Sequence, residues 1–133
     1  MSAVLNNGVL AISIDLELNV ERRGLDQQQS LETVTRQLTD LLQGYQMAAT
    51  WAVADPAVSA ATDRLLAASA EHELAVLGER SWVGREAGRS RFSRGLARRV
   101  THGRAAGLPI TSLVLREVEI DDHLDVVAKQ NLS

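Results

Sequence analysis

The chain has 133 residues, a length that suits one domain with its own hydrophobic core. Because only 3% of the residues are aromatic, that core is expected to be aliphatic. The chain has no cysteine, which excludes disulfides, thiolate metal sites and a cysteine nucleophile. No stretch has the length and apolarity of a membrane span and no signal-peptide pattern is present, so we expect a cytoplasmic protein that does not bind membranes.

Apolar, β-rich segments alternate with helical patterns along the chain. The strands are expected at residues 9–18, 47–54, 73–77 and 110–115. The helices are expected at residues 30–44, at 55 to about 70, between the loop at 78–88 and Gly107, and after a cap at Asp121 or Asp122. This order predicts an α/β fold of about four β–α units with a parallel sheet, in a single domain of residues 1–133.

The first helix shows the clearest amphipathic pattern. Polar residues 19–29 are expected to form a loop, after which Ser30 caps the helix and Gly44 ends it. The helical spacing of five aliphatic residues places them on one face. These residues are Leu31, Val34, Leu38, Leu41 and Leu42.

Positive charge is concentrated in one region of a chain whose net charge is −3. Between Arg80 and Arg104 there are eight arginines and a single acid, Glu86. Such a patch can bind phosphate or polyanions, or it can be a solvated helix face that pairs with acids elsewhere. The candidate polyanion-binding residues are Arg89, Arg91, Arg94 and Arg98. We expect an anionic ligand here rather than nucleic acid.

Ligand-binding groups in parallel α/β folds gather at the carboxyl ends of the strands. Asp15 and Glu17 lie two residues apart at the end of the first expected strand, so their carboxylates point the same way. They can bind a hard cation or supply a general base, or one can cap a helix while the other is solvated. The three histidines lack the spacing of a helical zinc pair, and a structural role is expected for His72.

Four segments of the chain follow one another in the order and at the spacing seen in a known protein family. Residues 10–18 read LAISIDLEL, and residues 34–56 read VTRQLTDLLQGYQMAATWAVADP. EHELA follows at 71–75, and a helix–strand–helix pattern follows at 96–132. Together they resemble the polysaccharide deacetylase family, also called carbohydrate esterase family four. The resemblance implies the first part of a distorted (β/α) barrel, a divalent metal, usually zinc, and the removal of acetyl groups from sugar polymers.

Carried over to this sequence, the resemblance places Asp15 at the position of the catalytic base. The acidic metal ligand of the family's motif falls on Leu16, and Glu17 is the residue that could stand in for it. The two histidine ligand positions fall on Leu77 and Ser81. The arginine that orients the base falls near Val114, two residues before Arg116. Neither leucine nor serine is a usual zinc ligand. The resemblance therefore implies a truncated domain that is degenerate at its metal site. We expect no bound cofactor. If the chain does bind one, zinc or another divalent cation is the cofactor that the resemblance implies.

We expect a catalytically inactive, deacetylase-like domain that acts as a binding or assembly module for a carbohydrate or anionic ligand. Because four β–α units leave open sheet edges, a homo-oligomer or a partner protein is expected to cover them. One alternative is an active metal-dependent hydrolase, a carbohydrate deacetylase that uses Asp15 and Glu17 with His72 or Glu79. The other is a phosphate or polyanion binder that uses the arginine-rich helix.

Overall fold

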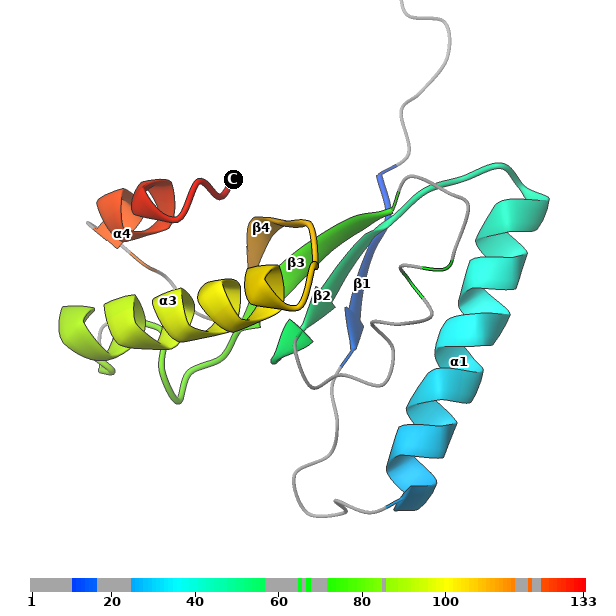
Figure 1. Cartoon of the computed structure of the whole chain (residues 1–133), viewed down its shortest axis with the longest axis horizontal. Coiled ribbons are helices and arrows are strands. Elements are labelled where there is room, and N and C mark those ends of the chain that lie inside the picture. The colour runs from blue at the N-terminus through cyan, green and yellow to red at the C-terminus, as the bar shows by residue number, and fades with distance from the viewer. Residues whose placement is uncertain are drawn as a thin grey trace, which may run out of the picture.

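The sheet has four parallel strands in the order β1-β2-β3-β4 (Figure 1). The computed structural model describes residues 11–16, 25–56, 65, 67, 72–84, 86–116, 120 and 123–133. Its elements are β1 (Ser13–Leu16), α1 (Leu25–Gly44), β2 (Thr50–Val53), β3 (Glu73–Gly78), α3 (Arg89–Ala105), β4 (Ile110–Leu115) and α4 (Leu124–Lys129). The predicted α/β fold of about four β–α units with a parallel sheet is confirmed.

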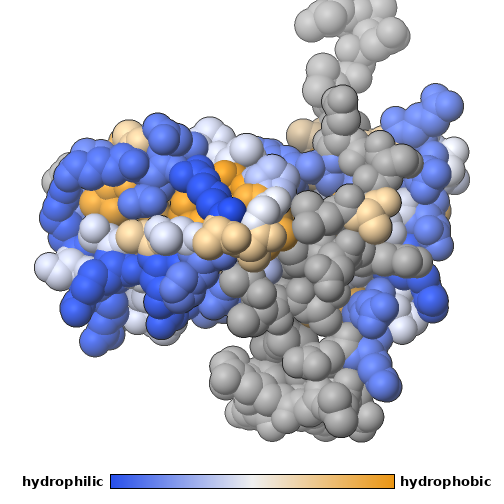
Figure 2. Space-filling model, viewed as in Figure 1, coloured by the Kyte–Doolittle hydropathy of each residue, from blue (hydrophilic) through white to orange (hydrophobic). Residues whose placement is uncertain are grey.

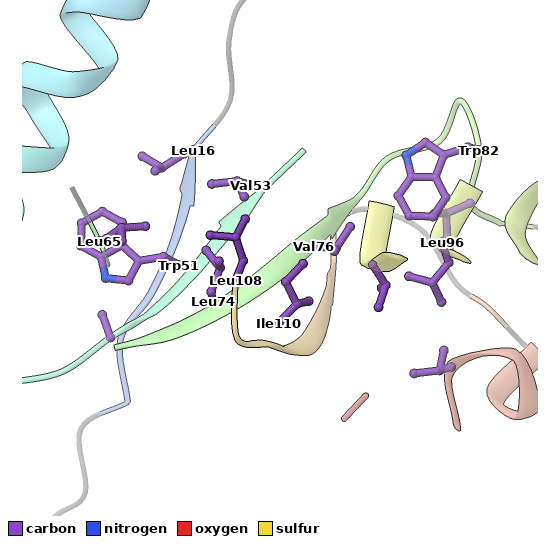
Figure 3. Packing of buried hydrophobic residues seen from close by; sticks show 14 of the residues in the cluster. Leu16, Trp51, Val53, Leu65, Leu74, Val76, Trp82, Leu96, Leu108 and Ile110 are labelled. Atoms are coloured by element: carbon purple, nitrogen blue, oxygen red, sulfur yellow. The ribbon is translucent and has the colours of Figure 1, made fainter. Parts of the chain in front are cut away.

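The main hydrophobic core lies on one face of this sheet (Figure 3). Trp51 and Val53 of β2 lie there beside Leu74 and Val76 of β3, and all four side chains are buried. Helices α1, α3 and α4 contribute to the same cluster through Leu42, Phe92, Leu96, Val100, Val126 and Val127. Because consecutive right-handed crossovers between neighbouring strands place their helices on one side, this one-sided core follows from the sequential strand order.

A smaller cluster lies on the opposite face, where the side chains alternate with those of the main core. It consists of Ala52, Ala75 and Leu77, with Val114 packed against it. The three buried residues have no exposed surface. The two faces are therefore distinct, and the second one carries small and aliphatic residues.

Helix α1 differs from the prediction in its start and in the face that it buries. It begins at Leu25, so the loop predicted through residue 29 was wrong; glutamine is a good helix former, and its polar side chain does not need burial. The helix ends at Gly44 as predicted. From residue 29 onward, where the side chains of the helix are described, Thr35, Thr39 and Leu42 are buried, whereas Val34 and Leu41 are exposed. The five aliphatic residues thus share one side of the helix without all reaching the core.

The other strand boundaries agree with the prediction to different degrees. Strand β2 covers only Thr50–Val53 of the predicted residues 47–54, and residues 11–12 of the first predicted strand lie outside β1. Strand β4 spans the predicted residues and β3 ends one residue later than predicted. Helix α3 stops before Gly107, whose φ of 83° is a left-handed conformation that glycine adopts easily. The predicted caps of the last helix, Asp121 and Asp122, lie outside the described residues, as does most of the helix predicted after Asp55.

Beyond the four strands, Ser133 pairs with the outer edge of β4. The amide of Leu113 donates to the Ser133 carbonyl and the Ser133 amide donates to the Thr111 carbonyl, both at 3.0 Å. One edge of the sheet that the sequence predicts to be open is therefore partly closed by the chain itself. In the described part of the chain, no helix is both long and apolar enough to cross a membrane.

Candidate functional site

The predicted base, Asp15, lies on β1 with an exposed side chain. The register pairs Asp15 with Ala52, Ala52 with Ala75, and Ala75 with Ser112, so these four residues form one row across the second face of the sheet. The side chains beside Asp15 in this row are methyl groups, which neither ligate a metal nor donate a hydrogen bond. Glu17, the predicted metal ligand, lies outside the described residues.

The two positions that the resemblance assigns to histidine ligands have different surroundings. Leu77 is completely buried and packs with Ala52, Ala75 and Val114, so hydrocarbon fills the space around its side chain. Ser81 lies in the loop after β3 with an exposed side chain. Among the described residues, no three His, Asp or Glu side chains are grouped so that they could hold a metal ion.

The predicted orienting position, Val114, belongs to the same aliphatic cluster as Leu77. Arg116, two residues further on, is exposed beyond the end of β4. A different arginine reaches the carboxyl ends of the strands. Arg99 of α3 donates from Nε to the carbonyl of Ala54 at 2.9 Å, and its guanidinium lies 4.3 Å from the centre of the Trp82 ring.

Arg99 joins the end of β2 to the loop after β3 and to α3. Burial lowers the pKa of Arg99, and the carboxylates of Asp55 and Glu79 act against that change. Trp82 is itself buried and its ring lies 6.1 Å from Phe92. These contacts hold the carboxyl end of the sheet against α3. Arg99 therefore has a structural role at the end of the sheet where the sequence predicts ligand-binding residues.

His72, which the metal alternative invokes, does not lie beside Asp15. Its Nδ1 accepts a hydrogen bond from the amide of Ala49 at 3.0 Å, and its ring meets Trp51 edge-on with centroids 5.7 Å apart. Trp51 and Ala52 point to opposite faces of β2, so His72 lies on the core face and Asp15 on the other. Burial lowers the pKa of His72.

The arginine-rich helix carries a continuous line of cationic side chains. Arg91, Arg94, Arg98 and His102 follow at steps of three, four and four residues, so they lie along one side of α3 and all four are exposed. We call these four residues the arginine stripe. No acidic residue occurs within α3. Figure 2 shows strongly hydrophilic side chains gathered over this part of the molecule.

The guanidinium groups of the stripe are weakly engaged by the protein. Arg91 donates to the carbonyl of Ser81 at 3.5 Å, and Arg94 donates to the carbonyl of Ser90 at 3.4 Å, both long for hydrogen bonds. Both side chains are exposed. This side of α3 can therefore offer several charged donors to an anion.

Arg89, the first of the four predicted anion-binding arginines, has a different partner. Its two terminal nitrogens donate to the two carboxylate oxygens of Asp125 on α4, one of them over 2.8 Å. This ion pair lowers the pKa of Asp125 to about 2. Because a bidentate carboxylate occupies its guanidinium, Arg89 joins α3 to α4 and we leave it out of the stripe.

A polar cluster that no sequence pattern predicts surrounds Glu73 at the amino ends of the strands. The hydroxyls of Thr50 and Thr111 donate to the Glu73 carboxylate at 2.7 and 3.0 Å, and the hydroxyl of Ser112 also donates to it. These bonds, that from Ser112 foremost, lower the pKa of Glu73. Because β2, β3 and β4 each supply a member, the cluster is visible only once the strands are in register.

Comparison of the chain with known protein families, with curated proteins and with solved structures found no match.

Proposed function

We propose that this chain is a non-catalytic binding module on a deacetylase-like scaffold, and that it binds a linear polyanion along the arginine stripe. The observation that carries the proposal is the row of exposed guanidinium groups on α3, with no acid on the same helix. The positive charge is local: residues 80–104 hold eight arginines and one acid, in a chain whose net charge is −3. A ligand attracted by charge is therefore directed to this helix.

The spacing of the stripe fits a repeating anionic polymer rather than a single small ion. Arg94, Arg98 and His102 follow at four-residue steps, each of which advances about 6 Å along a helix axis. A linear polymer with regularly repeated carboxylates or sulfates can meet several of these side chains at once. Arginine suits such groups because its planar donors can engage two oxygens of one anion.

The positions of the aromatic residues favour a polymer without nucleobases. Proteins that bind single-stranded nucleic acid stack bases on exposed aromatic rings. The chain has four aromatic residues, and Trp51, Trp82 and Phe92 are all buried. The fourth, Tyr45, is exposed but follows α1, at the other end of the molecule from α3 (Figure 1). We therefore propose an acidic polysaccharide as the ligand.

The non-catalytic part of the proposal is supported by the side chains near Asp15. A zinc-dependent deacetylase needs ligands that hold the metal beside its base. Here Leu77 stands at one of the implied ligand positions, enclosed by Ala52, Ala75 and Val114. The sequential order of the strands is that of a barrel built from consecutive β–α units, and in that respect it supports the deacetylase-like scaffold.

Binding is tested with a fluorescently labelled oligouronate, by anisotropy over a series of salt concentrations. The double variant Arg94→Gln, Arg98→Gln is expected to bind about tenfold more weakly, because each exposed ion pair contributes up to about 1 kcal/mol. The salt slope is expected to fall by about one for each arginine removed. Arg36→Gln, which removes one exposed arginine from α1, is the charge control and is expected to bind like the wild type.

Two further probes separate the possible outcomes. A neutral dextran of similar length is expected not to bind, and a single-stranded oligonucleotide of equal charge is expected to bind no more tightly than the uronate. Equal loss of binding in Arg36→Gln and in the double variant, or binding that salt does not weaken, contradicts the proposal. For the non-catalytic part, stoichiometric zinc together with acetyl-ester hydrolysis that Asp15→Asn abolishes would restore the enzyme alternative.

A further inference from the structure

Helix α1 carries an apolar line with the spacing of a coiled coil. Five residues follow one another at steps of three, four, three and four: Leu31, Val34, Leu38, Leu41 and Tyr45. We call them the α1 seam. Tyr45 follows the last helical residue, and its amide donates to the carbonyl of Leu41 at 3.3 Å, which continues the helical turn. Alternating steps of three and four are those at which one helix meets another along its length.

The seam lies at the edge of the core-facing side of α1: Leu31 and Leu38 are half-buried and pack against the main core, whereas the other three side chains are exposed. The exposed fractions of Val34, Leu41 and Tyr45 are 46%, 55% and 73%. The side of α1 that faces the core instead carries Thr35 and Thr39, with exposed fractions of 0% and 6%. Each of these hydroxyls donates to a backbone carbonyl of the same helix, at 2.7 and 2.9 Å. The helix therefore buries two hydroxyls beside Leu42 while Val34 and Leu41 stay in solvent, which is not the pattern of an ordinary amphipathic helix.

The charges around the seam indicate which partner fits it. The helix positions that flank it on the solvent side are uncharged: Ser30, Gln37 and Gly44. The charged side chains Glu32, Arg36 and Asp40 occupy positions about 140–180° around the helix from the seam, at 100° per residue. Two copies of this surface can meet without like-charge repulsion, although the chain as a whole is negatively charged. A strongly charged partner, by contrast, finds no complementary charge there.

We propose that the α1 seam is a self-association surface, along which α1 of one copy packs antiparallel to α1 of a second copy. An interface in which one surface meets itself closes with two-fold symmetry and leaves no surface for further growth. The antiparallel arrangement sets the two helix macrodipoles in opposite directions.

The size of the seam sets the expected strength of this association. From Leu31 to Tyr45 it extends about 21 Å at 1.5 Å per residue. One pair of helices of that length buries less than the roughly 1,200 Å² at the lower end of stable interfaces, so we expect a dissociation constant on the order of 10–100 µM. The pair would carry its two arginine stripes at opposite ends, since α1 and α3 lie at opposite ends of the molecule (Figure 1).

Sedimentation equilibrium of the purified chain, without any polyanion, tests the proposal. The wild type is expected to shift from monomer to dimer as its concentration rises to about 500 µM. Leu41→Gln is expected to weaken the dimer at least tenfold. Leu124→Gln is the matched control, because Leu124 is also an exposed leucine, 66% accessible, but lies on α4. Both substitutions replace exposed side chains, so neither is expected to unfold the chain.

A cross-linking experiment tests the orientation, and the absence of native cysteine makes it direct. In the antiparallel pair, the copies of Gln37 face each other beside the seam, so Gln37→Cys is expected to form an intermolecular disulfide. Gln43→Cys is the control. Residue 43 is also exposed but lies on the opposite side of α1 from the seam, so its thiol is expected to remain reduced. A concentration-independent monomer mass, equal dimerisation of Leu41→Gln and wild type, or no cross-link through residue 37 would each overturn the proposal.

Discussion

Replacement of Glu73 by glutamine is expected to destabilise the fold, because this carboxylate joins three strands. It begins β3 and accepts hydroxyl hydrogen bonds from Thr50 on β2 and from Thr111 and Ser112 on β4. Hydrogen bonds to a charged group contribute about 1.5–3 kcal/mol each, and glutamine keeps one acceptor oxygen. We therefore expect Glu73→Gln to lower the free energy of unfolding by about 2 kcal/mol at pH 7.

The pH dependence of this effect has a defined sign. Because the hydroxyl bonds lower the pKa of Glu73 from its ordinary value of 4.5, the folded state holds the carboxylate charged at pH values where the unfolded chain takes up a proton. The stabilisation is complete above about pH 4.5 and is lost as the pH falls further. The glutamine variant does not titrate, so its stability is expected to approach that of the wild type in acid.

Urea unfolding followed by circular dichroism measures both quantities. A loss of about 2 kcal/mol corresponds to a midpoint about 1 M lower in urea at pH 7. Glu32→Gln, which changes an exposed carboxylate on α1, is the control and is expected to shift stability by less than about 0.5 kcal/mol. The reasoning is refuted if Glu73→Gln and Glu32→Gln behave alike at pH 7, or if the effect at residue 73 stays constant from pH 7 to pH 3.

Two further predictions concern Leu77 and His72. Leu77→His introduces the residue type that the resemblance implies. It is expected to lower the free energy of unfolding by about 3 kcal/mol, because an imidazole replaces leucine in a fully buried aliphatic cluster. The prediction is contradicted if metal analysis finds tightly bound zinc in this variant and urea unfolding shows no loss of stability. Since burial lowers the pKa of His72 below 6.5, its contribution to stability is complete above about pH 6.5 and is lost as the pH falls, so His72→Gln is expected to unfold with a weaker pH dependence between pH 7 and 5. An unchanged pH profile in that variant would refute the role of His72.

The four-unit architecture was predictable because parallel strands and their helices leave local patterns in a sequence. The β-rich run ITSLVL gave β4 at its observed boundaries, and glycine marked the ends of α1 and α3. The start of α1 was not predictable in the same way. Glutamine-rich residues fit either a loop or a solvent-facing helical turn, and periodicity of apolar residues does not distinguish the two.

The candidate site was only partly predictable, because local patterns in a sequence show which residues of one element lie together but not which elements they contact. The sequence indicates that Arg91, Arg94 and Arg98 of α3 share a face, since helical spacing is a local property. It does not show that Arg89 pairs with Asp125, thirty-six residues away, or that Arg99 lies over Trp82. Those contacts depend on how α3 packs against α4 and against the loop after β3, which helical spacing within one element does not determine.

By itself, then, the sequence determined the β–α alternation, a core that is mostly aliphatic and the local excess of arginine. Only the tertiary structure decided that Leu77 is enclosed by other aliphatic side chains, that Glu73 gathers hydroxyls from three strands, and that α1 turns Thr35 rather than Val34 toward the core. The physical reason is that periodicity fixes which residues share a face, whereas the rotation of that face toward core or solvent depends on packing between elements distant in the chain.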